Sequence, residues 1–416
     1  MSLVNVISAI GNNSSIYPLL VRDCGIENPI KLGLTYKQNL KDSKEMANNA
    51  LRERAIDEYV CSAIWLGGIP VMDRICNWGI KKLGYDPNVD MNLFKESSKQ
   101  GLEKNIELFK NSAKEEVKGI EKVLKNKKTY EKLMAGKFVL STLIPVLLMG
   151  VVLPKMNFAL TAKLKKQQKE KQKAQPEIKN TGKEVSFKGN FVTTLANMST
   201  VNKMACTDGG LTIGRVSTGR NTNERLELGF KMLGMMFLNF VAPKWIAKGF
   251  DTASNKIFNT NVNLDPKILN DSEFLNAIKD GTLKLPKKGE IIEFLDKNPN
   301  EKFSKLVKDF CGVEYLENGV RDPRKFVDEE KISKFQAEIE KFAKEAKNSP
   351  DADKFAKKAL RVKSGNIIAN VVLSSILLAI CLPKLTFYLR KLVTGSDAEP
   401  GLVDNNAQKR EKNTLK

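Results

Sequence analysis

Two long stretches without a charged residue constrain this chain most. They cover residues 138–153 and 367–382, and we call them the strong runs. Each ends in a Pro-Lys pair, and the pattern Leu-Pro-Lys-x-x-Phe-x-Leu occurs at 153–160 and again at 382–389. An apolar stretch of this kind is stable only when it is buried away from water, either in a protein core or in a bilayer.

The flanking lysines favour a bilayer over a core. Each strong run has 16 residues, fewer than the roughly 20 that cross the hydrocarbon layer. At 1.5 Å per residue, Lys137 to Lys155 covers about 27 Å and Lys363 to Lys384 about 31 Å. Lysines at those distances reach the headgroups on opposite sides. The alternative is a pair of core helices in a soluble protein, but two such runs in one lysine-rich chain are hard to bury. We therefore expect two transmembrane helices.

Two further apolar stretches, the weak runs, cover residues 59–72 and 226–242. The first is short, and Glu227 and Lys231 interrupt the second. A full span, a re-entrant segment and a core helix all remain open for them. The apolar runs all end at prolines, and a further proline inside the first strong run predicts a kink. The predicted span ends and kink are Pro70, Pro154, Pro243 and Pro383, with Pro145 as the kink.

The order of features repeats along the chain. Each half has a Gly-rich or turn-rich loop (21–36 and 208–220), a Glu-Arg pair, a weak run, an Asp-Pro pair, a charged helical arm and a strong run. In the first half an apolar stripe predicts one long helix over 98–131. The predicted fold class is all-α: a multi-pass helical membrane protein of two tandem repeats, each with a weak apolar helix, a charged amphipathic arm and a strong transmembrane helix.

The domain prediction follows from this order. The expected parts are a first repeat at 1–164 (apolar helices about 59–80 and 133–162), a basic disordered linker at 165–189, a second repeat at 190–395 (apolar helices about 226–250 and 364–392) with a helical insert at about 268–350, and a disordered tail at 396–416.

Two groups of small residues are candidate sites. In the second strong run and just before it, small residues stand four apart, which favours close helix packing, and we expect the two strong runs to lie side by side. The Gly-rich segment 208–220 resembles an anion-binding loop, but Arg220-Asn221 stands where a phosphate loop has Lys-Ser/Thr, so a plain connector is the alternative. The helix-packing candidates are Gly365, Ala369, Ser375 and Ala379; the weak anion-loop candidates are Gly209, Gly210, Gly214, Arg215, Gly219 and Arg220.

Carboxylates beside the weak runs are the remaining candidates. An acid at membrane depth is a functional candidate by default, while the alternative is that these acids only mark helix ends. The residues concerned are Glu53, Asp57, Glu58, Asp73 and Glu227.

Composition argues against common catalytic chemistry. The chain has no histidine, which removes the commonest general base and metal ligand. Its six cysteines form no C-x-x-C pair. We therefore expect no enzyme, no cofactor and no metal. Lys and Arg outnumber Asp and Glu by 21, which suits anionic lipid headgroups.

The sequence favours a structural or interaction role for an integral membrane protein. Expected partners are the bilayer, anionic headgroups, and a partner protein or second copy through the amphipathic helices, with no nucleic acid. One alternative is a transporter or lipid-handling protein with a site between the repeats; a soluble basic nucleic-acid binder is another. The basic cluster after residue 154 places the linker and the tail in the cytoplasm by the positive-inside rule. If Pro70 and Pro243 lie in full spans that face a polar cavity, the transporter is favoured over the structural role.

Overall fold

The computed structural model describes residues 2–13, 15–41, 43–94, 100–110, 114–157, 159–160, 163, 198–219, 221–287 and 289–395. All regular structure in these ranges is helical, apart from one isolated β-bridge between Tyr315 and Arg321. The helices before residue 160 are α1 (Leu3–Gly11), α2 (Tyr17–Leu20), η1 (Val21–Glu27), α3 (Asn28–Asn39), α4 (Lys44–Ala63), η2 (Ile64–Gly68), α5 (Ile69–Lys82), η3 (Met91–Phe94), α6 (Leu102–Phe109), α7 (Lys114–Lys125), α8 (Lys127–Leu147) and η4 (Leu148–Val152). Those after it are α11 (Thr200–Thr218), α12 (Thr222–Met236), η5 (Phe237–Val241), α13 (Ala242–Phe258), α14 (Pro266–Leu269), α15 (Ser272–Lys279), α16 (Ile291–Lys297), α17 (Lys302–Cys311), α18 (Glu329–Asn348), α19 (Ala352–Ile376), η6 (Leu377–Cys381) and α20 (Leu382–Thr394).

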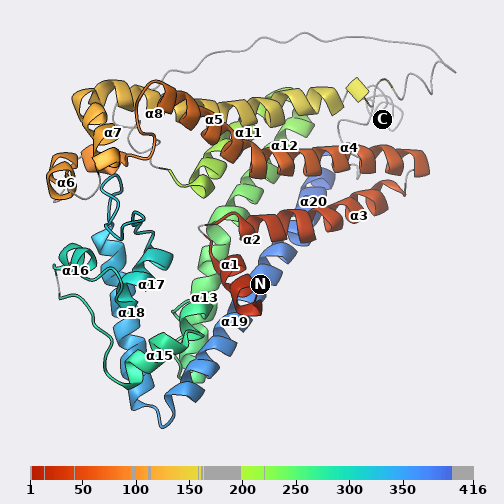
Figure 1. The fold of residues 1–416 in the computed structure, drawn as a ribbon. Helices are drawn as coiled ribbons and strands as arrows, with labels where there is room; N and C mark the ends of the chain where they lie inside the picture. Colours follow the sequence, from red (N-terminus) through yellow and green to blue (C-terminus); the bar gives the residue numbers. More distant parts are fainter. Residues whose placement is uncertain are drawn as a thin grey trace, which may run out of the picture.

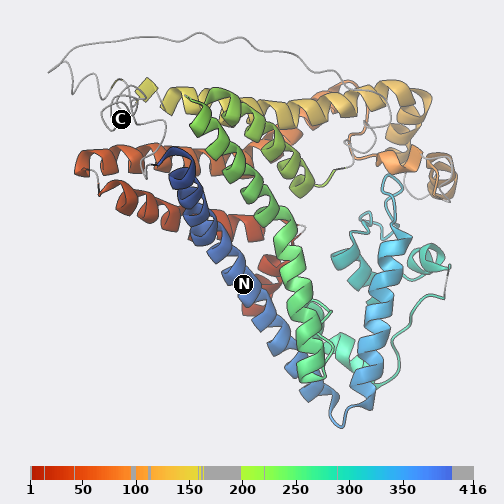
Figure 2. The same ribbon diagram turned by 180° about the vertical axis from the view of Figure 1, so that it is seen from behind.

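Long continuous helices form the frame of the molecule. The pairs α12–α13 and α19–α20 run side by side through it, whereas α4, α5 and α8 cross one end (Figures 1 and 2). Neighbours in the chain pack as hairpins: α3 on α4, and α11 on α12. Helix α8 packs mainly on α5 and α11, and α19 mainly on α13 and α1. The strong runs therefore have other helices as their main partners, contrary to our expectation that they lie side by side.

Several of the continuous helices contain a π-helical segment just before a proline. The five π-helices among the described residues, η1, η2, η4, η5 and η6, all end two residues before a proline. A proline lacks the N–H group that a regular helix needs, and its ring clashes with the carbonyl group four residues earlier. Widening the helix by one residue relieves both problems, which is a common origin of π-bulges. The prolines concerned are Pro29, Pro70, Pro154, Pro243 and Pro383.

The prolines that end the apolar runs do not end the helices in which they lie. The chain stays helical through Lys82 after Pro70, through Phe258 after Pro243 and through Thr394 after Pro383. Pro145 lies inside α8, which continues past it. A proline interrupts only one hydrogen bond, and a local π-turn absorbs that loss without ending the helix.

Within the described ranges, three helices are long and apolar enough to cross a membrane: Lys127–Asn157, Thr222–Phe258 and Ala352–Val393. Their outer faces carry large apolar side chains that are more than a third exposed. A water-soluble monomer rarely exposes such continuous apolar stripes. The exposed residues at helical spacing include Leu140, Leu143 and Leu147 on α8, Leu226, Leu233 and Phe237 on α12 and η5, and Ile368, Val372 and Ile376 on α19.

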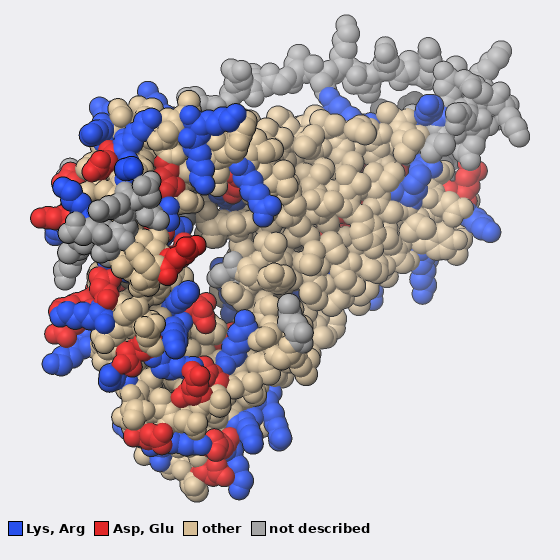
Figure 3. All heavy atoms as spheres, viewed as in Figure 1, with Lys and Arg blue, Asp and Glu red and all other residues tan. Residues whose placement is uncertain are grey.

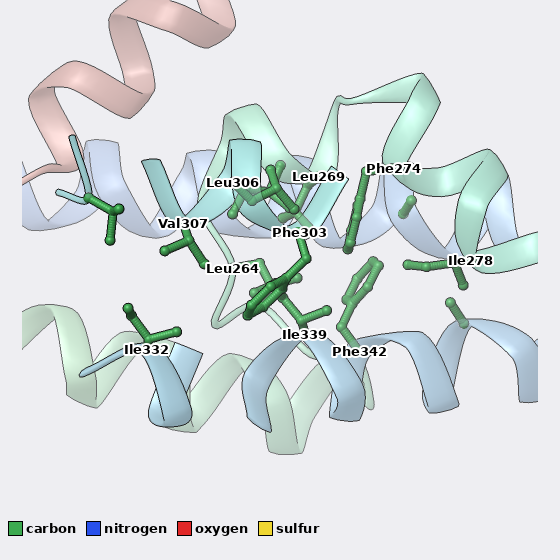
Figure 4. Close-up of a cluster of buried hydrophobic side chains, with 14 of the residues drawn as sticks. Leu264, Leu269, Phe274, Ile278, Phe303, Leu306, Val307, Ile332, Ile339 and Phe342 are labelled. Carbon is green, nitrogen blue, oxygen red and sulfur yellow. The ribbon is translucent and has the colours of Figure 1, made fainter. Parts of the chain in front are cut away.

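A separate helical lobe follows α13. Helices α14 to α18 surround an apolar core that runs from Leu264 to Ala359, with Phe274 stacked on Phe342 (Figure 4). Charged side chains crowd this lobe and the neighbouring arm, whereas the surface over the long helices is almost free of them (Figure 3). Burial raises the pKa of the Cys311 thiol to about 11, so that it stays a neutral thiol at pH 7.

The arm of the first half is not one long helix. It divides into α6, α7 and the start of α8, which fold over a small core around Ile120 and Tyr130. The expected stripe is present, but its partner is this local core and the chain turns between the segments. The arm also joins the lobe: Gln100 and Val327 exchange two hydrogen bonds of 2.7 and 2.8 Å, and Arg324 lies 2.9 Å from Asp86.

Two segments expected to be loops are helical. Residues 21–36 lie in η1 and α3, and residues 208–218 lie in α11. Their Gly, Pro and Asn content predicts turns in water, but tight packing against other helices stabilises the helical form here. The linker at 165–189 and the tail at 396–416 lie outside the described residues.

A charged cavity as the candidate functional site

Helices α3, α4, α11, α12 and α20 meet around a cavity of about 150 Å³. Its lining comes from both halves of the chain and mixes apolar with ionised side chains. The π-bulged ends of the strong runs contribute Pro154 and Pro383. A few tens of Å³ already hold a water molecule, so this space suits a small solute. The ionisable lining residues are Lys31, Glu53, Arg54, Asp57, Arg215, Glu224, Glu227, Lys231 and Arg390.

Two Arg-carboxylate forks hold the helices around the cavity. Arg215 of α11 donates two hydrogen bonds of 2.8 and 2.7 Å to Asp57 of α4. Arg390 of α20 binds both oxygens of Glu227 of α12, with one bond of 2.8 Å. Paired, two-point contacts of this kind are the strong form of an ion pair. They fix α11 to α4 and α20 to α12, so the cavity wall is held by charges at its edge.

Glu58 lies at the centre of a second group of charges. Arg54 is 2.6 Å from one of its oxygens, Lys31 is 3.5 Å from the other, and Lys231 is 3.9 Å away. Lys31 also pairs with Glu27 one turn earlier in the chain. Lys31 and Glu58 are buried. Ionised groups removed from water cost several kcal/mol each unless they are paired, as these are.

A smaller cavity of about 50 Å³ adjoins the first one. The two share Asp57, Arg215, Lys231 and Met235 in their linings. The smaller cavity adds two acids from different helices, Asp23 of η1 and Asp208 of α11, together with Cys61, Ser62 and Asn239.

Several polar atoms that line the larger cavity lack a partner in the described part of the protein. They are Glu53 Oε1, Arg54 Nε and Asn157 Oδ1, all of them buried. Buried polar atoms in native structures are almost always hydrogen-bonded. Their position in the cavity wall favours a polar occupant.

The acids singled out from the sequence are mostly brought together. Glu53, Asp57, Glu58 and Glu227 all line one or both cavities. Asp73 does not: it binds Lys203 at 2.8 and 2.7 Å and lies beside a separate surface hollow. The interpretation that these acids only mark helix ends fails for the first four, since all of them line a cavity and Asp57, Glu58 and Glu227 are also paired with cations.

The Gly-rich segment does not form an anion-binding loop. In α11, a side chain at Gly210 would lie 2.9 Å from Val146, and one at Gly214 would lie 3.2 Å from Gly150 of η4. These glycines therefore permit close approach of α11 to the first strong run. Gly209 is also within α11, Gly219 follows its end, Arg215 is bound to Asp57, and Arg220 lies outside the described residues.

The small residues of the second strong run behave differently from one another. Ser375 and Ala379 are buried, as close packing requires. Gly365 has no atom within 4 Å of a potential side chain, so the packing prediction is wrong there. Ala369 is half-buried.

Sequence reasoning missed five members of the site: Asp23, Lys31, Asp208, Lys231 as a Glu58 neighbour, and Arg390. Asp23 and Lys31 lay in a segment interpreted as a loop. The available signal was the spacing of Asp23, Glu27 and Lys31, which are four residues apart and share a helix face.

The described side chains of the site are not arranged to bind a metal ion. In the part of the chain that the structure describes, no cluster of three or more Cys, Asp and Glu side chains has a metal-binding arrangement. Comparison with family models, curated proteins and solved structures finds no match to this chain. The cavity and its charges are therefore the basis for inferring function.

Proposed function

We propose that this protein is an integral membrane transporter whose joined cavities take up a small charged solute. The observation that carries the proposal is a set of ionised side chains enclosed by helices with apolar outer faces. Charges at membrane depth are costly, and membrane proteins retain them along solute and ion paths. A purely structural role would not need such a set, so the cavity favours transport over the interaction role that the sequence suggests.

The length of the helices and their exposed apolar side chains support the proposal that several of them cross the bilayer. Three helices have the length and composition of spans, and α4–α5 is a further continuous helix with Pro70 in its middle. Both weak runs thus lie in long helices beside the cavities, which is the arrangement expected of a transporter. We place the linker and the tail on one side, because Pro154 and Pro383, which precede them in the two halves, line the same cavity.

Reciprocal packing supports an origin from two tandem repeats. Each half supplies a hairpin and then a long helix with a π-bulge before Leu-Pro-Lys. The first helix of each half packs on the last helix of the other: η1 and α3 on α19 and η6, and α11 on α8 and η4. Such an exchange suits halves of one orientation, related by an axis along the membrane normal.

Aligning the two halves by their prolines gives a different residue correspondence from aligning them by their Glu-Arg pairs. Glu53 lies 17 residues before Pro70, whereas Glu224 lies 19 before Pro243. Two residues turn a helix by about 200°, so the Glu-Arg pairs point in different directions. In the alignment by prolines Glu58 corresponds to Lys231, and these opposite charges form an ion pair of 3.9 Å in the wall of the smaller cavity.

Solute binding is expected to raise the melting temperature of the purified protein. The test compares an amino acid, a dicarboxylate, inorganic phosphate and a diamine. A solute at about 100 times its dissociation constant adds about 2.7 kcal/mol. The solute that raises the melting temperature of the wild type should not raise that of the Lys231→Met variant. The same solute should enter proteoliposomes that contain the wild-type protein.

The control is Lys305→Met, an exposed lysine of the lobe that lies far from the cavity in sequence and lines none of it. It should respond to the solute as wild type does. If the effective solute stabilised the Lys231→Met variant as strongly as wild type, or bound without entering vesicles, transport through this cavity would be excluded.

A further inference from the structure

The smaller cavity holds two acids that the ion pairs of the site do not account for. Asp23 accepts a hydrogen bond from the Ser62 hydroxyl group, which in turn accepts one of 3.2 Å from Asn28. Asp208 is only 8 % exposed, and its carboxyl group has no hydrogen bond or ion pair to any described residue. Both residues line the same space of about 50 Å³.

The two acids come from helices that have the same packing role in the two halves. Asp23 belongs to η1 and Asp208 to α11, the helices that pack on the last helix of the opposite half. Each is followed by a glycine two residues later, Gly25 and Gly210. One cavity therefore receives one acid from each half, beside the polar groups that form the larger cavity.

The neighbouring cations are engaged elsewhere. Arg215 of α11 is bound to Asp57 through both terminal nitrogens. Lys31 of α3 pairs with Glu27, and Lys231 of α12 has Glu58 as its nearest acid. Arg22 of η1 donates to the Asn239 carbonyl group at 3.3 Å. The remaining titratable group facing the space is the Cys61 thiol of α4, which accepts from Arg215.

We propose that Asp23 and Asp208 bind one proton between them and form the coupling-ion site of the transporter. A buried carboxylate without a cation is unfavourable, and two carboxylates in one small space strongly favour sharing a proton. The proton comes from water on one side, converts one carboxylate to a carboxylic acid, and leaves to water when the cavity opens to the other side. A divalent ion is disfavoured because no third ligand is in place in the described residues.

This inference rests on the proposed function, but its test needs no transported solute. The melting temperature of the purified full-length protein is measured between about pH 5 and about pH 9. The wild type should melt lower as the pH rises, because ionising the second carboxyl group leaves an unpaired buried charge. Asp208→Asn carries a permanent neutral mimic of the acid, so it should match wild type at low pH and melt at least about 4 °C higher at high pH.

Asp23→Asn is the second variant, and Asp309→Asn, an exposed acid of the lobe, is the control that should follow the wild-type curve. The infrared band of a protonated carboxyl group in the wild-type protein adds a readout without mutation; it should disappear as the pH rises.

An equal loss of stability for Asp208→Asn at every pH would show that the ionised carboxylate of Asp208 is needed for stability, and would overturn the proposal. Stabilisation of the wild type, but not of the variant, by sodium chloride over choline chloride would replace the proton by sodium. Failure of solute uptake with a positive proton result would reject only the transport proposal.

Discussion

An arginine in place of Leu148 is expected to keep the first strong run out of the membrane. Leu148 is 40 % exposed on the outer face, where the account places lipid. Arginine at a helix centre costs roughly 2.5–3.5 kcal/mol on insertion scales, which corresponds to about a hundredfold shift toward the non-inserted form. Val372→Arg on the second strong run should have the same effect. A glycosylation reporter fused after each helix measures the inserted fraction.

Leu392→Arg is the matched control, since this residue is also exposed but lies near the end of α20. An arginine there reaches the headgroups and should insert normally. Normal insertion of both Leu148→Arg and Val372→Arg would mean that the strong runs are not spans.

The second large effect concerns the Arg215–Asp57 fork. Asp57→Leu should destabilise the protein by about 3–5 kcal/mol, because it leaves a buried guanidinium group without its partner. The side chain of Arg215 is only 9 % exposed, so water in the adjoining cavity replaces the lost carboxylate only in part. Unfolding of the purified protein in denaturant, followed by circular dichroism, provides the measurement.

The double variant Asp57→Leu/Arg215→Met removes both charges and should recover most of the lost stability, since an apolar pair replaces a buried ion pair at little cost. Glu293→Ala, which breaks the exposed pair with Lys297, is the control and should leave stability nearly unchanged. Additive losses in the double variant would show that the two side chains do not act as a pair.

The long apolar helices could be predicted because their cause is local. The absence of charge over 138–153 and 367–382 is visible in the sequence, and the flanking lysines give the length. The acids beside the weak runs were also identifiable, because a carboxylate next to an apolar stretch is unusual. Four of the five predicted acids line the cavities.

The partners of those acids could not be predicted from spacing. Glu227 and Arg390 are 163 residues apart, and Asp57 and Arg215 are 158 apart. Only the packing of helices that are distant in the sequence brings them together: α12 with α20 inside the second half, and α4 with α11 between the two halves. Residues 21–36 and 208–220 were interpreted as loops because Gly and Pro signal turns in water. Here Gly210 and Gly214 allow α11 to approach α8 and η4 closely. Whether a glycine forms a turn or a helix contact therefore depends on the partner helix, which the local sequence does not contain.

Thiol labelling on the two faces of α12 tests the central claim, that apolar outer faces meet lipid while the cavity is open to a polar solute. Met235 lines both cavities, whereas Leu233, two residues away on the same helix, is 63 % exposed on the outer face. Met235→Cys and Leu233→Cys are made singly in a background without the six native cysteines. Both are treated with a small, charged thiol reagent in sealed membranes.

We expect the Met235→Cys protein to react, from one side of the membrane, and the Leu233→Cys protein to stay unlabelled, because lipid suppresses thiolate formation. Labelling of Leu233→Cys at a comparable rate would place the outer face of α12 in water, and an unreactive Met235→Cys protein would close the cavity to solutes; either result contradicts the account.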